Sequence, residues 1–173
     1  MSYLAEILEI NEWFILTVSI AGFFVITLFP RKFTRPQRLT MFLIGFYFVT
    51  LFDQTLAKPP FNYYDVNDSG SFTIWDLLSY FMYTPFTYIY LSGLTVIRKT
   101  RLGVFAYVIG WAVFSILSEG AAWLAGVYHY NKGYTLLQSF PVYLFVLSLT
   151  LLYYHYFVNQ IAKSRSSFRQ RSN

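Results

Sequence analysis

Three acidic side chains lie inside long apolar stretches of the sequence: Asp53, Asp76 and Glu119. An ionised carboxylate in hydrocarbon costs several kcal/mol, so such groups normally face a protein interior or a water-filled cavity and mark a functional path. Residues three and four apart share a helix face, and polar residues stand at that spacing near each acid. The predicted polar site comprises Asp53, Gln54, Asp76, Tyr80, Tyr83, Glu119, His129 and Gln138. The chemistry expected of such a site is the binding of a cation or a small solute.

A second candidate site precedes the third apolar stretch. From Asp65 to Asp76 the sequence reads Asp-Val-Asn-Asp-Ser-Gly-Ser-Phe-Thr-Ile-Trp-Asp. This spacing resembles the twelve-residue calcium loop of EF-hand and dockerin domains, in which oxygen ligands wrap the ion around a sharp turn at a central glycine. The predicted calcium ligands are Asp65, Asn67, Ser69, Ser71, Thr73 and Asp76.

Two departures from the usual calcium loop predict weak binding, suited to roughly millimolar calcium. Ser69 replaces the usual Asp or Asn, and Asp76 replaces the usual Glu, although dockerin-type loops also end in Asp. The alternative is an ordinary turn followed by a helix cap, because turn residues and ligand residues are of the same types.

Familiar catalytic patterns are missing from the sequence. Without cysteine there is no thiolate chemistry, zinc-thiolate site or iron–sulfur cluster. The two histidines are expected at opposite ends of the last apolar stretch, and neither an HExxH motif nor a phosphate-binding glycine loop nor a GxSxG elbow occurs. We therefore expect a protein without enzymatic activity. It is either a sensor or transport-related subunit with a polar pocket, or an accessory protein that binds another membrane protein and uses its polar residues only to hold helices together.

The composition indicates which solvent surrounds the elements that must position these residues. The chain of 173 residues is 56% apolar and only 12% charged. Soluble domains carry roughly 45–50% apolar and about 25% charged residues, so this chain lacks the polar surface to coat a globule in water. A membrane helix takes about 20 mainly apolar residues. The sequence therefore predicts a protein embedded in a lipid bilayer.

Apolar runs bounded by charged residues predict an all-α, multi-pass transmembrane bundle of five helices. The expected single domain covers residues 1–161, and a basic tail covers residues 162–173. The five spans are expected at residues 13–29, 39–56, 72–97, 102–127 and 134–161.

The basic residues predict the orientation, because lysine and arginine near span ends stay on the cytoplasmic side. All but Lys58 and Lys132 lie in the first loop, the third loop or the tail. The N-terminus is therefore expected outside and the C-terminus in the cytoplasm. The basic face suits anionic lipid head groups, and no nucleic-acid recognition motif accompanies it. Tyrosine and tryptophan favour the interfaces. The expected outer belt is Trp13, Trp75, Tyr128, Tyr130 and Tyr134, and the expected inner belt is Tyr153, Tyr154 and Tyr156.

Several aromatic motifs along the chain suggest a family. They are Tyr64-Asp65, Tyr83-x-Pro85-Phe86, Glu119 followed by Gly126-Val-Tyr128, and Ser139-Phe-Pro-Val-Tyr143. With these motifs the chain resembles uncharacterised small five-helix integral membrane proteins of Gram-positive spore-forming bacteria. The resemblance covers about two thirds of the chain and implies a bacterial plasma membrane as the location. It implies no activity.

Overall fold

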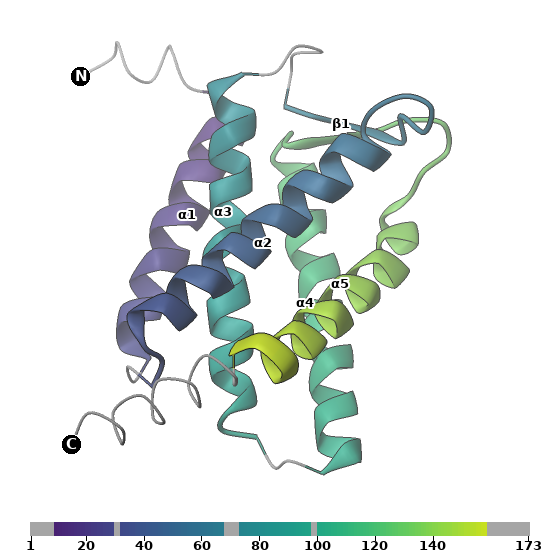
Figure 1. The fold of residues 1–173 in the computed structure, drawn as a ribbon. Coiled ribbons are helices and arrows are strands. Elements are labelled where there is room, and N and C mark those ends of the chain that lie inside the picture. The colour runs from purple at the N-terminus through teal and green to yellow at the C-terminus, as the bar shows by residue number, and fades with distance from the viewer. Residues whose placement is uncertain (1–8, 30–31, 68–72, 98–99, 159–173) are drawn as a thin grey trace, which may run out of the picture.

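The computed structural model describes residues 9–29, 32–67, 73–97 and 100–158, and these form five long helices. They are α1 (Ile10–Leu28), α2 (Arg35–Leu56), α3 (Ile74–Leu94), α4 (Arg101–Leu124) and α5 (Ser139–Tyr153), shown in Figure 1. A short 3₁₀ helix, η1 (Leu136–Gln138), leads into α5, and a π-helical turn, η2 (Tyr154–Val158), follows it. The predicted helical class is confirmed, and each helix overlaps the corresponding predicted span. The basic tail, 162–173, lies outside the described residues.

The first two helices begin where local capping satisfies their free N–H groups. The side chain of Glu12 accepts from the N–H of Glu9 at 2.8 Å, and that of Gln37 accepts from the N–H of Thr34 at 2.9 Å. Proline near the start of α2 adds a fixed backbone angle that suits the first helical turn. These polar caps therefore define where the two helices begin.

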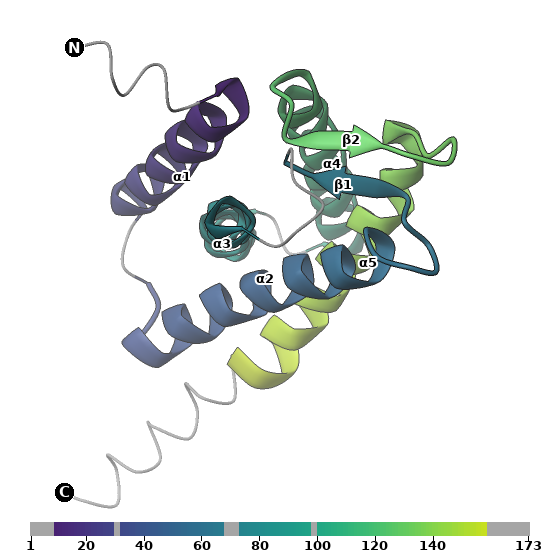
Figure 2. The same ribbon diagram turned by 90° about the horizontal axis from the view of Figure 1, so that it is seen from above.

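Within the described residues, four helices are long and apolar enough to cross a membrane. These are α1, α2, α4 and the continuous helical stretch Leu136–Phe157. The third predicted span, residues 72–97, overlaps α3, which is not among these four because it carries many tyrosine, serine and threonine residues. Its position explains this difference. Viewed from above, α3 stands in the middle of the bundle (Figure 2), so the other helices cover it and it needs no apolar surface toward lipid.

Consecutive helices run in opposite directions, and α3 lies between two groups (Figures 1 and 2). It packs mainly against α1 and α2, whereas α4 packs mainly against α5. Two glycines allow the close approach on the first side. A Cβ added to Gly22 of α1 would lie 3.0 Å from Cγ of Pro85, and one added to Gly45 of α2 would lie 3.0 Å from Cβ of Thr87. Small residues of this kind let membrane helices pack at short range.

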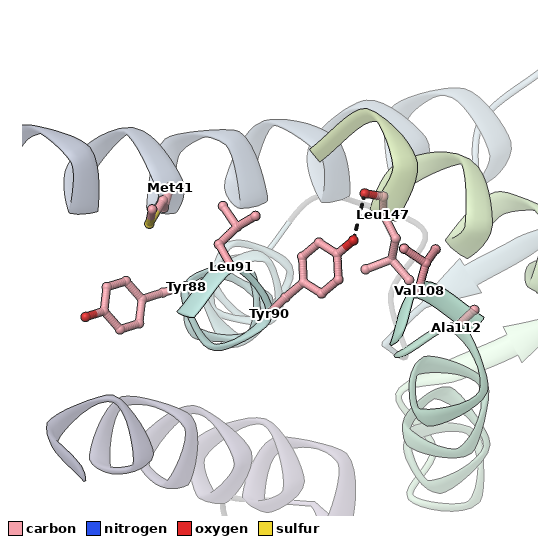
Figure 3. Close-up of a cluster of buried hydrophobic side chains, with 7 residues drawn as sticks. All are labelled: Met41, Tyr88, Tyr90, Leu91, Val108, Ala112 and Leu147. Atoms are coloured by element: carbon pink, nitrogen blue, oxygen red, sulfur yellow. Dashed lines mark hydrogen bonds between the residues drawn. The ribbon is translucent and has the colours of Figure 1, made fainter. Parts of the chain in front are cut away.

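The central hydrophobic cluster joins α3 to both groups (Figure 3). It contains Met41, Tyr88, Tyr90, Leu91, Val108, Ala112 and Leu147. The hydroxyl of Tyr90 donates to the backbone carbonyl of Leu147 on α5 at 3.2 Å, and Tyr107 of α4 donates to the carbonyl of Tyr90 at 2.6 Å. Tyr90 and Tyr107 are tolerated here because each of these two hydroxyls finds a partner.

A small antiparallel sheet, which we did not predict, lies at one end of the bundle. Strand β1 (Tyr64–Val66) pairs with β2 (Tyr128–Tyr130), so that Asp65 lies opposite His129. Asn67 and Gly126, next to the two strands, have positive φ angles, which Asn and Gly adopt most readily. Figure 2 shows the two strands over the end of the bundle where α4 ends and α5 begins. The sheet therefore ties the loop before α3 to the loop after α4.

Candidate functional site

A cavity of about 470 Å³ lies inside the bundle, and every helix from α1 to α5 and both strands contribute to its wall. Helical spacing brings α2 to this wall through Gly45, Phe48, Phe52 and Asp53, which share one face. The polar side chains of the wall include Asp53, Tyr64, Ser79, Tyr80, Tyr83, Glu119, Tyr128, Tyr134, Ser139 and Tyr143. Among the described residues that line the cavity, none is lysine, arginine or histidine. The cavity is therefore acidic and otherwise largely aromatic and apolar.

Asp53 joins α2 to α3 at this wall. Its carboxylate is only 7% exposed and accepts a hydrogen bond from the hydroxyl of Tyr80. The side-chain amide of Gln54 donates to the same hydroxyl at 3.1 Å, although Gln54 itself does not line the cavity. Burial disfavours the ionised form of a carboxylate, whereas a hydroxyl donor favours it. The arrangement therefore places a hydrogen-bonded carboxyl group at the cavity wall.

Glu119 occupies the side of the cavity formed by α4. It is also 7% exposed, and its Oε1 accepts from the hydroxyls of Tyr130 and Ser139, each at 2.7 Å. Tyr143 of α5 contacts the same carboxylate. The Ser139 hydroxyl has one hydrogen and donates it to Glu119. The hydroxyl of Tyr134, 3.0 Å away, therefore donates to the Ser139 oxygen. A chain of hydroxyl donors from β2, the following loop and α5 thus converges on one buried carboxylate.

The pKa of Tyr64 of β1 is affected by both acidic residues of the cavity. Burial raises the pKa of Tyr64 well above its usual value, and the negative charge of Asp53 raises it further. Glu119 contributes in the same direction. The pKa of Tyr130 also rises, first because of burial and then because its hydroxyl donates to Glu119. Both phenols therefore stay protonated, and Tyr64 lies within electrostatic range of both carboxylates.

Of the eight predicted residues of the polar site, the structure brings Asp53, Tyr80, Tyr83 and Glu119 to the cavity wall. Tyr83 shares a hydrogen bond between hydroxyls with Tyr128 of β2, which joins α3 to the sheet.

The other predicted residues lie elsewhere. The side chain of Gln138 accepts from the N–H of Thr135 at 2.6 Å and so caps η1. His129 is exposed in β2 and does not extend the polar face of α4, because α4 ends at Leu124.

Asp76 serves as a cap at the start of α3. Its Oδ2 accepts from the N–H of Thr73 at 2.6 Å, and its Oδ1 accepts from the side-chain amide of Asn67 at 2.8 Å. The predicted calcium ligands are therefore only partly assembled. Asn67, Thr73 and Asp76 lie together, whereas the side chain of Asp65 is exposed and accepts from Asn131. Ser69 and Ser71 lie outside the described residues.

Sequence reasoning missed the tyrosines that complete the Glu119 site. Tyr128, Tyr130 and Tyr134 were expected in an interfacial belt, but their hydroxyls bond to Tyr83, Glu119 and Ser139 respectively. Their short distance from Glu119 along the chain was the available signal. Searches with the chain against protein-family models, curated proteins and solved structures find no match.

Proposed function

We propose that the protein is a multi-pass plasma-membrane protein whose cavity opens outward and binds a cation or small solute, as a sensor or transport-related subunit. The observation that carries this proposal is the charge of the cavity. Asp53 and Glu119 lie in one wall with no basic side chain among the described lining residues. The hydroxyl of Tyr80 donates to Asp53, and those of Tyr130 and Ser139 donate to Glu119. A bound cation would supply the missing positive charge, and a buried acid without one is costly.

The cavity should therefore bind cations through Asp53 and Glu119. We expect at least one salt in a panel of sodium, potassium, magnesium, calcium and organic ammonium chlorides to raise the melting temperature of the purified protein, because a ligand of the folded state stabilises it by mass action. The Asp53→Asn/Glu119→Gln double variant should lose that rise. Both changes keep the size and one acceptor oxygen of each side chain while removing the charge.

The matched control is Glu9→Gln, which makes the same chemical change at an exposed residue outside the cavity. It should keep the rise in melting temperature. Equal rises in the native protein and in the double variant, for every salt tested, would contradict the proposal.

The hydrogen bonds of the same residues favour a second candidate function, that of an accessory protein bound to another membrane protein. Asp53 with Tyr80 connects α2 to α3, and Glu119 with Ser139 connects α4 to α5. In this case the carboxylates only hold helices together. The double variant would then be less stable than the native protein but would respond to every salt in the same way.

We also propose that α3 is a fifth crossing, with the N-terminus outside and the C-terminus in the cytoplasm. Its 21 residues span roughly 32 Å at 1.5 Å per residue, close to the thickness of the hydrocarbon layer. The end of the bundle away from the sheet carries the described basic residues Lys32, Arg35, Arg38 and Arg101 (Figure 1). A cytoplasmic location suits them.

Single-cysteine labelling tests this orientation, since the chain has no cysteine of its own. An impermeant reagent should modify Lys58→Cys in intact cells, because Lys58 is exposed near the sheet end. Ser166→Cys in the tail should react only after lysis. The reverse pattern would show that the orientation is wrong.

Calcium binding by the segment from Asp65 to Asp76 is a separate proposal. One feature favours it: Oδ1 of Asn67 is buried and has no hydrogen-bond partner in the described part of the chain, and oxygen is the ligand that calcium prefers. Calcium at millimolar concentration should raise the melting temperature more than magnesium does. Asp65→Ala should lose most of this rise, and the double variant of the cavity should keep it. A calcium effect that Asp65→Ala leaves intact would leave this segment an ordinary turn.

A further inference from the structure

We infer that the ligand of the cavity is an amphipathic organic cation, with an ammonium group between Asp53 and Glu119 and a small apolar body against the aromatic wall. This inference rests on the proposed cation site and names its ligand class. Three properties of the cavity support it: the placement of its charges, its ring-lined wall and its volume.

The charges lie on separate helices around the sheet end of the cavity. Asp53 belongs to α2 and Glu119 to α4, and Tyr64 of β1 interacts electrostatically with both. Each carboxylate offers about four lone-pair positions. Tyr80 uses one on Asp53, while Tyr130 and Ser139 use two on Glu119, which Tyr143 also contacts. An ammonium group has up to three N–H donors, and its hydrogen bonds to carboxylates are strong because both partners are charged.

A bare metal ion suits this arrangement less well. Calcium takes about six to eight oxygen ligands at 2.3–2.6 Å, and magnesium requires about six oxygen ligands in octahedral geometry. Within the described residues, no group of three or more His, Cys, Asp or Glu side chains could hold a metal ion. The two carboxylates of the cavity belong to different helices, α2 and α4, and each already accepts from a tyrosine hydroxyl. A group that donates hydrogen bonds in several directions suits them better than a metal ion that needs many oxygens.

The rest of the cavity wall is aromatic and suits a ligand with an apolar or ring-containing part. The rings of Phe86 and Phe114 lie 6.2 Å apart, and those of Phe114 and Trp111 lie 5.2 Å apart in an edge-to-face arrangement. Phe48 completes this wall from α2. Aromatic faces attract cations as well as apolar groups. An organic ammonium ion gains from both properties, whereas a hydrated inorganic ion would leave most of the wall unused.

The volume agrees with a small organic ligand. The cavity measures about 470 Å³, within the range of roughly 300–1,000 Å³ that small-molecule sites occupy. A single ion with its first shell of water would fill only a fraction of it.

The test compares 2-phenylethylammonium with its neutral counterpart 2-phenylethanol, using the full-length protein in nanodiscs. Dissociation constants are measured by equilibrium dialysis. We expect the ammonium ion to bind at least about tenfold more tightly than the alcohol, and Asp53→Asn/Glu119→Gln to lose roughly tenfold or more of its affinity. Glu9→Gln, at an exposed residue outside the cavity, should bind like the native protein. Trp111→Leu should weaken binding of the ammonium ion by about threefold to thirtyfold.

The outcomes separate this inference from the proposed function. Binding of potassium or calcium that depends on Asp53 and Glu119, without binding of 2-phenylethylammonium, would overturn the inference and leave the cation site in place. Equal affinity for the ammonium ion and the alcohol would overturn the inference, because charge would then contribute nothing. Failure of every cation to bind would overturn both.

Discussion

Replacing Glu119 with leucine is expected to lower the free energy of unfolding by about 2–4 kcal/mol. The carboxylate accepts from Tyr130 and Ser139, and it thereby connects α4 to the sheet and to α5. Leucine has a similar size but accepts no hydrogen bond, so both hydroxyls would lose their partner at a site that is only 7% exposed for the native side chain. Hydrogen bonds to a charged group contribute more than those between neutral groups. The measurement is unfolding of the purified protein in mixed detergent micelles, followed by circular dichroism.

Two further variants show whether the hydrogen bonds cause the loss. Glu119→Gln keeps one acceptor oxygen and should cost clearly less than Glu119→Leu. Ser118→Ala is the control on the preceding residue, because within the described part of the chain the Ser118 hydroxyl bonds only to the carbonyl of Phe114 in the same helix. It should change the stability by less than about 0.5 kcal/mol. If Glu119→Leu were as stable as Ser118→Ala, the hydroxyl chain would have no structural role.

Hydropathy and charge were sufficient to predict the helical class, because both follow from how each residue interacts with lipid and water. They placed α1, α2, α4 and the last helical stretch near their observed bounds. Helical periodicity also directed Asp53, Tyr80 and Glu119 toward the interior, and all three line the cavity. These predictions need only the sequence near each residue.

The features that the sequence did not reveal depend on which segments meet. Strands of three residues carry too short a pattern to be recognised, so the pairing of β1 with β2 was missed. That pairing places His129 outside the cavity and brings Tyr130 to Glu119. Two other predicted site residues, Asp76 and Gln138, do not reach the cavity. Their side chains instead accept from N–H groups at the start of their own helices. A polar residue beside a helix start is thus ambiguous until its partners are known.

The polarity of α3 also depends on which segments meet in the fold. From the sequence, the polar residues spaced along one face of this span, among them Tyr80 and Tyr83, were expected to point into the bundle. In the bundle α3 is surrounded, and residues such as Ser79, Thr84 and Tyr88 are buried against neighbouring helices. How closely those helices approach α3 is therefore decisive for the fold, and Gly45 lies at the closest approach of α2.

Replacing Gly45 with alanine is expected to lower the free energy of unfolding by about 1–3 kcal/mol, the usual cost of overpacking a dense interior. The added Cβ would overlap the hydroxyl oxygen of Thr87 and lie 3.0 Å from its Cβ. Rotation of the Thr87 side chain would move its hydroxyl but not its Cβ, so it could relieve only part of the strain, whereas the backbone Cα of Thr84, at 3.5 Å, is in ordinary contact. The free energy lost by overpacking should exceed the free energy of up to about 1 kcal/mol that alanine gains over glycine from its higher helix propensity.

A double variant and a control make this prediction specific. Thr87→Ala removes the hydroxyl that the new Cβ would meet, so Gly45→Ala should cost less in that background than in the native protein. The difference, measured as a double-mutant cycle of unfolding free energies, isolates the contact between α2 and α3. Gly110→Ala on α4 is the control, because a Cβ there meets nothing within 4 Å. It should leave the stability unchanged or raise it slightly. A gain in stability from Gly45→Ala as well would mean that α2 and α3 do not pack at this distance, and the cavity wall that they share through Asp53 and Tyr80 would have to be built differently.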